Sequence, residues 1–496
     1  MLIEKENFSI AIIGGGLGGL AAALALQQSG FNVIVYERDN LFSDRKQGYG
    51  LTLTNNSKGP LAKLGVLNEV LAKDCPSYRH FVFKPSGTLL GYYGRELKET
   101  ISNDAISQES NTRGNIRIPR QDLRNILLNK LKPGTVMWDH SLVSYDEDNE
   151  GISLFFDSNK ESEGLSRKSI RANLLIGADG INSVVRRIND TLNYDVIQSP
   201  LRYIGVSVII GLSKAVHPLV NKGGFYVLDG KHHRLFVMPF REASACLTCT
   251  QRTGDELKQC DDCNSTCQLT MWQLSFSGVD EKEGLRLKKA SSEEIKAEAM
   301  RRTSSWFEPV AALIAHTSAA DVWATPLYDR DPMQQRPKSK TSATSAKRQK
   351  LHPDDASVRI PTNYSCPRKV VTVLGDAAHP MSMFKGQGCN QAMEDGPLLA
   401  SWLARPGLST ANVVTRLRCF EREMVARSAS KVIGSRQAAE LYHSPQALEE
   451  PFGFEGVAGD ELSAFTAAVA DRGVTAGDGA ELTGRMKATL DSIRHK

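Results

Sequence analysis

Glycine and acidic residues follow apolar runs at three places in the chain, and this combination suits a ligand rich in hydroxyl or phosphate groups. The most informative place is segment 370–400, where the β-branched apolar run Val370–Leu374 leads into Gly375 and Asp376. A run of this kind predicts a strand that is covered on both faces. Asp376 would then lie at the carboxyl end of the strand, where open α/β sheets bind ligands.

The turn Gly386-Gln387-Gly388 follows, with a helix expected from about Cys389. Glycine has no Cβ, so the backbone of this turn can approach a ligand closely. The helix N-terminus adds N–H groups and a partial positive charge. Such a device suits a flat ligand that becomes anionic, as a reduced flavin does. The alternative is an ordinary strand–loop–helix unit of an α/β fold.

The N-terminal segment supplies the second combination. A strand is expected at Ser9–Ile13, a helix at Leu17–Ser29 and a second strand at Asn32–Tyr36, which ends at Glu37. Between the first strand and the helix, the motif G-x-G-x-x-G is formed by Gly14, Gly16 and Gly19. In this context the glycines allow a tight turn beside a pyrophosphate, and the acid accepts from a ribose hydroxyl. The segment therefore predicts a dinucleotide site, with an adenosine ribose that carries no 2′-phosphate.

The third combination is Gly177-Ala178-Asp179-Gly180, which follows the short apolar run Leu174–Ile176. A basic residue, Arg120, stands where a helix with an apolar stripe is expected to begin. A cation at a helix N-terminus is unfavourable beside the positive end of the helix dipole, so Arg120 is expected to bind an anion such as a phosphate. The alternative is an ordinary surface arginine.

Composition limits the class of protein. With 496 residues, 41% of them hydrophobic, the chain is long enough for two or three domains. The net charge of +5 gives no reason to expect a nucleic-acid partner. Nine cysteines, unevenly placed, favour a reducing compartment, and we expect a cytoplasmic monomer or homodimer. The apolar segment Phe8–Leu26 is glycine-rich and is interpreted as strand and helix, so no integral membrane segment is expected.

The remaining elements are read from periodicity. Residues 200–280 show short strands without helix signals, which predicts an antiparallel sheet. Helices are expected at about 56–72, 291–316 and 411–441, and a mobile Lys/Ser/Thr-rich loop at 337–355. We expect a discontinuous nucleotide-binding domain over residues 1–77, 111–195 and 366–445, a substrate domain over 78–110 and 196–365 with an insertion at 241–268, and a C-terminal helical appendage at 446–496.

Taken together, the three motifs resemble those of the class A flavoprotein monooxygenases, the para-hydroxybenzoate hydroxylase-like family that includes the tetracycline-inactivating enzymes. The resemblance covers about residues 8–440. It implies a glutathione-reductase-like, Rossmann-type α/β domain that binds FAD, an antiparallel-sheet substrate domain over the flavin, and C-terminal helices. The FAD-binding residues that it implies are Gly14, Gly16, Leu17, Gly19, Glu37, Arg38, Arg45, Arg120, Asp179, Asp376, Pro380, Gly386, Gln387 and Gly388.

The resemblance also implies the chemistry. NAD(P)H reduces FAD, O₂ adds at the flavin C4a carbon, and the hydroperoxide transfers oxygen to a small aromatic, polyketide-like or other electron-rich substrate. No catalytic side chain is required, and His379 is expected to be structural. The substrate wall is expected to include Tyr226, Met238, Trp272 and Phe384, although each fits ordinary core packing equally well. Weaker candidates for orienting a polar substrate group are Arg234, His232 and His233.

One insertion departs from the family pattern. The spacing C-x₂-C, ten residues, C-x₂-C could form a structural zinc site, although no metal is required by the chemistry and a fifth cysteine is left over. The four candidate ligands are Cys246, Cys249, Cys260 and Cys263, and the cysteine left over is Cys267. Three other functions remain open at this point: a flavin halogenase, whose W-x-W-x-I-P motif is missing here, an FAD-dependent reductase, and a non-enzymatic FAD-binding redox regulator.

Overall fold

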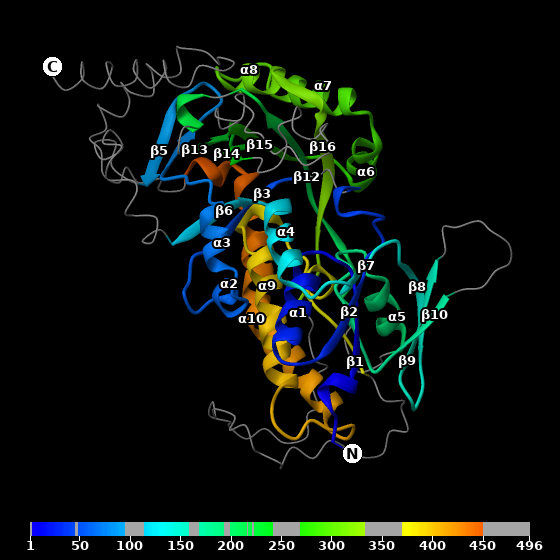
Figure 1. Ribbon diagram of the computed structural model, residues 1–496. Helices are drawn as coiled ribbons and strands as arrows, with labels where there is room; N and C mark the ends of the chain where they lie inside the picture. The colour runs from blue at the N-terminus through cyan, green and yellow to red at the C-terminus, as the bar shows by residue number, and fades with distance from the viewer. Residues whose placement is uncertain are drawn as a thin grey trace, which may run out of the picture.

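The computed structural model describes residues 2–44, 48–94, 114–157, 168–192, 199–215, 217–220, 223–241, 268–332 and 370–449. Two large sheets dominate these residues, one parallel and packed against long helices, the other lying above it in Figure 1. The expected mixed α/β class is therefore confirmed.

The parallel sheet has five strands in the order β17-β11-β1-β2-β7. Their bounds are β1 Ser9–Ile13, β2 Asn32–Tyr36, β7 Val136–Met137, β11 Leu174–Gly177 and β17 Val371–Val373. In the centre, Ile12 of β1 lies between Val35 of β2 and Ile176 of β11, and all three side chains are buried. Because parallel strands end at the same edge, the three glycine-rich segments meet there.

Long helices cover one side of this sheet (Figure 1). They are α1 Leu17–Gln28, α4 Arg120–Lys130, α9 Gly388–Leu403 and α10 Val413–Tyr442. Helices α1 and α9 approach so closely that a Cβ on Gly396 would lie 2.7 Å from backbone atoms of Ala21 and Ala22. The small residues thus permit backbone-to-backbone contact between the two helices.

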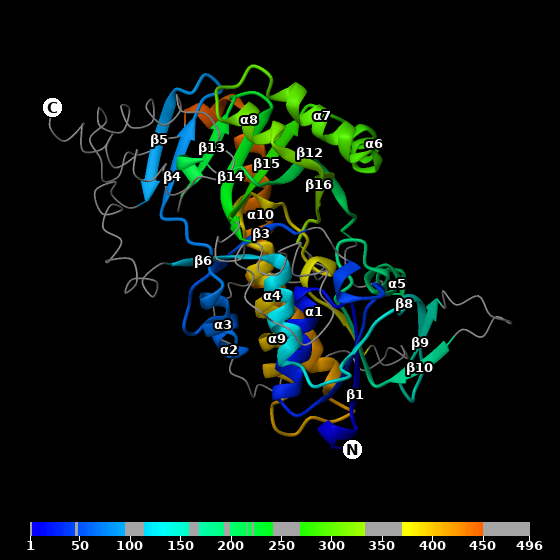
Figure 2. The same cartoon turned by 45° about the horizontal axis from the view of Figure 1, so that its top comes forward.

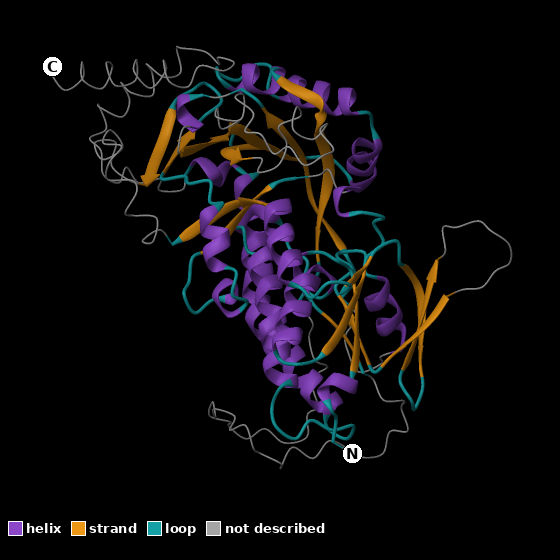
Figure 3. Cartoon of the chain, in the orientation of Figure 1, coloured by secondary structure: helices purple, strands orange, loops and turns teal. Residues whose placement is uncertain are grey.

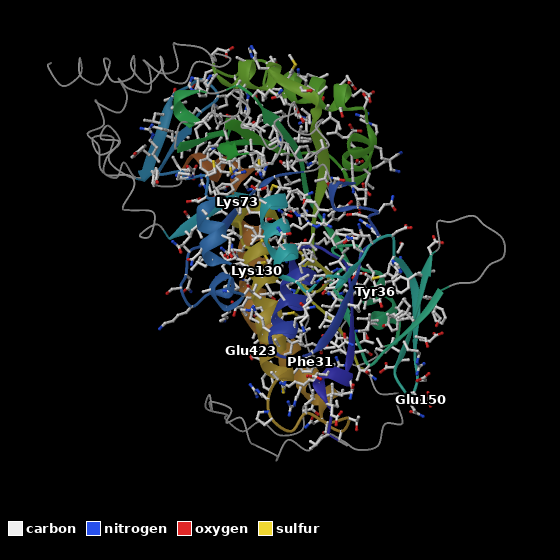
Figure 4. The ribbon with its side chains drawn as sticks, in the orientation of Figure 1. Phe31, Tyr36, Lys73, Lys130, Glu150 and Glu423 are labelled. Atoms are coloured by element: carbon white, nitrogen blue, oxygen red, sulfur yellow. The ribbon has the colours of Figure 1, made fainter. Side chains whose placement is uncertain are left out.

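The opposite side of the parallel sheet carries a three-stranded antiparallel sheet in the order β10-β9-β8 and helix α5. Their bounds are β8 Ser141–Glu147, β9 Ile152–Asp157, β10 Lys168–Ala172 and α5 Val184–Leu192. Tyr36, labelled in Figure 4, closes the gap between the sheets, with its ring centroid 4.8 Å from that of Phe156.

The upper sheet has seven strands in the order β16-β12-β15-β14-β13-β4-β5 (Figure 2). Their bounds are β4 Arg79–Phe83, β5 Leu89–Gly94, β12 Arg202–Ser213, β13 Gly223–Leu228, β14 His233–Arg241, β15 Gln268–Ser277 and β16 Thr317–Asp329. The strands within 200–280 pair antiparallel, as predicted, whereas β4 joins β13 in parallel. Helices α6 Glu281–Lys289, α7 Ser292–Arg302 and α8 Val310–Ala315 cover its far face (Figure 3).

Two predicted helices are broken. The expected helix 291–316 is the pair α7 and α8: α7 ends at Arg302, and Pro309, which has no N–H with which to continue a preceding helix, stands directly before α8. The expected helix 56–72 is divided into α2 Pro60–Lys63 and α3 Leu67–Ala72 by Gly65, whose φ is +69°. The predicted helix at 411–441 is confirmed as α10.

Strand β16 was not predicted from the sequence. It contains Pro326, which cannot donate to a neighbouring strand and so is tolerated at the edge of a sheet. A short two-stranded sheet, β3 Gly50–Thr54 with β6 Asn115–Pro119, lies between the two large sheets (Figure 1).

Some predictions fall outside the described residues. These are the cysteines of the 241–268 insertion, the 337–355 loop and all but the first residues of the 446–496 appendage. Along the described part of the chain, no helix is both long enough and apolar enough to cross a membrane.

Candidate active site

The N-terminal glycine motif, Gly14 to Gly19, forms the tight turn from β1 into α1. Gly14 has a φ of +105°, and its N–H donates to the carbonyl of Tyr36 over 2.8 Å. A Cβ on Gly14 would lie 2.5 Å from the Ala178 carbonyl oxygen, and one on Gly19 would lie 2.0 Å from the Gly14 carbonyl oxygen. A Cβ on Gly16 would meet no atom within 4 Å, so the turn is closed on the protein side and open at Gly16.

Glu37 ends β2 beside this turn, as the spacing predicts. Its carboxylate is buried and accepts from the backbone N–H of Gly15 over 2.5 Å and of Asp39 over 3.1 Å. Arg38 is exposed, and Leu17 is buried in the apolar core. Arg45 lies outside the described residues.

A buried cation that sequence reasoning missed supports the same turn. Arg124 is fully buried, and its Nε donates to the Gly15 carbonyl over 2.9 Å. The guanidinium lies 5.1 Å from the ring centroid of Phe42 and 5.4 Å from that of Trp138. In sequence Arg124 is one more charged residue in a helix with an apolar stripe, so only the three-dimensional packing identifies it.

Four side chains from three distant segments converge between the sheets: Tyr49, Arg120, Asp376 and Cys389. Arg120 begins α4, its N–H donates to the Tyr49 carbonyl over 3.0 Å, and its guanidinium lies 5.9 Å from the Tyr49 ring. Burial raises the pKa of Tyr49, which Arg120 opposes and Asp376 reinforces. Burial also raises the pKa of Cys389 to about 12, so its thiol stays neutral although it lies in the first turn of α9.

Asp376 is the accessible member of this group. The residue is exposed to solvent. Desolvation by the surrounding protein nevertheless raises the pKa of its carboxyl group, and the nearby His379 and Arg120 oppose that shift. Both properties fit a carboxyl that faces space inside the protein rather than bulk water. Pro380, nearby in the same loop, is buried.

His379 is structural in this arrangement, consistent with the prediction. Its Nε2 pairs with Asp395 Oδ2 over 2.8 Å, and Asp395 also accepts from the Gly375 N–H and from Arg427. Burial lowers the pKa of His379, but the attraction of Asp395 outweighs it and the pKa is raised overall. The His379–Asp395–Arg427 contacts therefore hold the loop after β17 against α9 and α10.

Asp179 caps a helix. Its carboxylate accepts from Ser183 Oγ over 2.5 Å and from the Val184 N–H over 2.7 Å, at the start of α5. From the same helix, the buried Arg186 donates to the carbonyls of Ala377 and Ala378 over 3.1 and 2.8 Å. The motif at 177–180 and the loop after β17 are thus tied together through α5, and a direct contact of Asp179 with a cofactor stays a prediction.

The turn at residues 386–388 is fixed by a residue that the sequence did not single out. Asn390 donates to the carbonyls of Thr52 over 3.0 Å and Gly386 over 2.9 Å, and accepts from the Thr54 N–H over 2.9 Å. Gly386 adopts a φ of +60°, and α9 begins at Gly388 with Gln387 as its N-cap. Strand β3 is thereby clamped to the turn.

The predicted substrate residues divide between the two faces of the upper sheet. Met238 and Phe384 pack together on the face toward β3, where Tyr226 also stacks on Phe236 at 4.6 Å. Trp272 does not join them. It is fully buried on the far face, where its Nε1 donates to Thr317 Oγ1 over 2.8 Å, so the structure places it in the core under the helices.

Met271, which precedes Trp272 in β15, occupies the face toward β3, and its Sδ accepts from the Gly50 N–H over 3.1 Å. Among the weaker candidates, His232 is exposed, and His233 pairs with Asp229 over 2.7 Å at the end of the sheet. Within the described part of the chain, no group of side chains suits a metal ion.

The geometry fits an extended dinucleotide. The open Gly16 position and the buried Glu37 lie at the ends of β1 and β2, and Asp376 lies at the end of β17 on the same sheet edge. Helices α1 and α9 both begin at this edge. Such a cradle offers backbone amides and accepting carboxylates at separate points along one ligand.

Comparison with known proteins agrees with this fit. A family model described as FAD binding domain matches residues 7–253. The chain is 25% identical over 450 residues to 3-amino-4-hydroxybenzoate 2-monooxygenase PtmB3 of Streptomyces platensis, covering 90% of this chain and 92% of the relative. It is 24% identical over 417 residues to 6-hydroxynicotinate 3-monooxygenase of Bordetella bronchiseptica, covering 82% and 86%.

Among solved structures, Klebsiella pneumoniae HpxO complexed with FAD and uric acid has a TM-score of 0.62 at 19% identity, covering 99% of this chain and 98% of that one. This likeness supports the fold alone. The domain match supports FAD binding, and the relatives support a monooxygenase. The domain match, the relatives and the fold fit the class A FAD-dependent flavoprotein monooxygenase family.

Proposed function

We propose that the protein hydroxylates a small electron-rich organic substrate, with NAD(P)H as electron donor and O₂ as oxidant. FAD would lie in the domain around the parallel sheet, which we assign to the glutathione-reductase-like, Rossmann-type class. The named relatives act on an aminohydroxybenzoate and a hydroxynicotinate, which supports an aromatic substrate here. Polyketide-like and other electron-rich compounds remain within the proposal.

The observation that carries the proposal is the convergence of Tyr49, Arg120, Asp376 and Cys389 at the parallel-sheet edge, beneath the methionine-lined face of the upper sheet. Oxygen transfer needs an apolar cover of this kind over the polar groups, because water must be excluded from the reacting centre.

The residues present would divide the cofactor between them. Gly14 and Gly16 with the N-terminus of α1 suit the pyrophosphate. Glu37 suits the adenosine ribose, because a carboxylate can accept more bonds than the two from Gly15 and Asp39. Asp376 suits a hydroxyl of the ribityl chain or a neighbouring group. The turn at 386–388 would support the flavin ring.

Bound FAD, once reduced, supplies electrons to O₂ and so an electrophilic oxygen for the substrate. The chain's own contribution is positional and electrostatic. The first turn of α9 leaves N–H groups without intrahelical partners, which stabilise negative charge on a ligand at Gly388. Met238, Met271 and Phe240 form the adaptable apolar cover that excludes water.

The direct test uses purified protein. It should be yellow, and a panel of hydroxybenzoates, hydroxypyridines and polyphenols should contain compounds that accelerate NAD(P)H oxidation under air. With ¹⁸O₂ the product should carry one labelled oxygen atom. If a wide panel neither stimulates NAD(P)H oxidation nor yields labelled product, the hydroxylase proposal is wrong.

The cofactor role of Asp376 has its own test. Asp376→Ala should weaken FAD binding by roughly 10- to 100-fold, the loss expected when a hydrogen bond to a charged group disappears. Burial raises the pKa of Asp376, which means that its negative charge does not stabilise the folded apoprotein. The Tm of the apoprotein should therefore not fall in this variant. A Kd for FAD in this variant equal to that of the wild type would refute the role.

A further inference from the structure

The guanidinium of Arg234 lies inside a box of four aromatic rings. Its Cζ is 5.1 Å from the ring centroid of Tyr226, 5.5 Å from Phe236, 5.2 Å from Phe384 and 5.1 Å from Tyr442. The side chain is only 5% exposed. We call these four rings the aromatic box.

The aromatic box joins the two layers of the molecule. Tyr226 of β13 and Phe236 of β14 belong to the upper sheet. Tyr442 is the last residue of α10, and Phe384 lies in the short 3₁₀ helix Met383–Lys385, directly before Gly386 and the turn at 386–388. A single cation therefore contacts the substrate sheet and the loop that leads into the proposed flavin seat.

The loop is also held from its other side. Ser382 Oγ donates to the carbonyl of Ser435 in α10 over 2.8 Å, and the Gly386 N–H donates to the Met383 carbonyl over 3.0 Å. Phe384 lies between these two bonds and packs its ring 5.3 Å from the imidazole of His443. The position of Phe384 is thus determined jointly by α10 and by the upper sheet.

A desolvated cation beside aromatic faces interacts with them more strongly than an exposed one does. We propose that Arg234 is a positioning residue of this monooxygenase: by holding Phe384 in the aromatic box, it fixes the turn at 386–388 that receives the flavin ring. The assignment of the flavin ring to this turn rests on the proposed function, whereas the contact between Arg234 and Phe384 is independent of it.

The test compares Arg234→Met with the wild type, because methionine fills a similar volume without the charge. Amide hydrogen exchange of the apoprotein at residues 384–388 should accelerate by about tenfold, and FAD should bind about tenfold more weakly, as for the loss of ~1.4 kcal/mol of positioning energy. The visible absorption band of bound FAD should shift as well. Exchange in β14 away from residue 234 should stay within about twofold.

Arg302→Met is the matched control. Arg302 of α7 also lies over an aromatic ring, 3.7 Å from the centroid of Phe276, but at the far side of the same sheet. This variant should leave exchange at 384–388 and the affinity for FAD unchanged. Arg234→Lys keeps a cation and should restore part of both properties.

Wild-type exchange at 384–388 in Arg234→Met would overturn the inference, as would an equal acceleration in Arg302→Met. If Arg234→Met does not fold, Arg234→Lys and Tyr442→Leu decide, and both must loosen 384–388 measurably. Hydrogen exchange of the apoprotein needs no turnover. A protein that fails to hydroxylate any substrate, yet shows the predicted exchange pattern, would refute the proposed function and leave the positioning role intact.

Discussion

The edge of the parallel sheet and the inner face of the seven-stranded sheet are built on different principles. At the parallel edge, functional groups sit in short contiguous segments, because β1, β11 and β17 each lead into a glycine-rich turn that delivers one or two side chains. On the seven-stranded sheet, the groups are spread over several strands, and each strand contributes alternate residues. A site of the first kind is written locally in the sequence, whereas a site of the second kind is determined by the side to which each residue points.

The largest expected effect lies at the parallel edge. Gly14→Ala would force a Cβ to 2.5 Å from the Ala178 carbonyl oxygen at a φ of +105°. We expect a loss of roughly 3–5 kcal/mol in the free energy of unfolding, from overpacking and backbone strain together, and loss of FAD. Chemical denaturation and the absorbance of bound flavin measure the two effects.

Gly65→Ala is the matched control for this prediction. Gly65 also has a positive φ, +69°, but a Cβ there would meet no atom within 4 Å. It should cost only about 1–2 kcal/mol and keep FAD. Equal damage from both substitutions would mean that the tight contact at Gly14 has no special importance.

The two faces of the upper sheet can be separated at neighbouring positions of β15. Trp272→Leu should cost about 3 kcal/mol, since it opens a cavity and leaves Thr317 without its indole donor, while the KM for substrate stays within about twofold. Met271→Leu conserves volume and should cost less than about 1.5 kcal/mol, but it should change the KM or the substrate preference.

Thermal unfolding and steady-state kinetics of both variants measure this contrast. A changed KM in Trp272→Leu with unchanged stability would reverse the assignment of the faces.

The smallest effect is a pH dependence at the joint between α10 and the upper sheet. Burial lowers the pKa of His443 from 6.5 to about 4, and its Nε2 pairs with Ser275 Oγ over 3.0 Å. Because the unfolded state binds the proton more readily, stability should fall as the pH drops from about 6.5 toward 4, by about 1–2 kcal/mol at pH 5.

His443→Gln should flatten this part of the profile. The check is the Tm of both proteins between pH 7 and pH 4.5. An identical slope in the variant would show that other groups cause the acid sensitivity.

The same contrast explains what could be predicted from the sequence. The turn after β1, Glu37 at the end of β2 and the elements that carry Asp376 were found because each depends on neighbouring residues. Which face Trp272 and Met271 occupy could not be predicted, because both faces of β15 are buried and alternation shows which residues share a face but not which face lies toward the site.

Partners across the fold were also invisible. Asn390 and Asp395 act on segments that only folding brings near them, and neither carries a local pattern that marks this role. Helix breaks at Gly65 and Pro309 were missed because apolar periodicity continued through both positions. The roles of individual cofactor and substrate residues remain predictions that the variants above address.

The contact between α1 and α9 has a consequence for cofactor choice. One helix starts beside Gly16 and the other at Gly388, and the backbone contact at Gly396 leaves no room for the two to slide closer. The protein therefore holds two anion-attracting helix ends on one closely packed pair of helices. We expect a dinucleotide that contacts both ends to be preferred over a mononucleotide such as FMN, so that selection for FAD depends on length as much as on any single hydrogen bond.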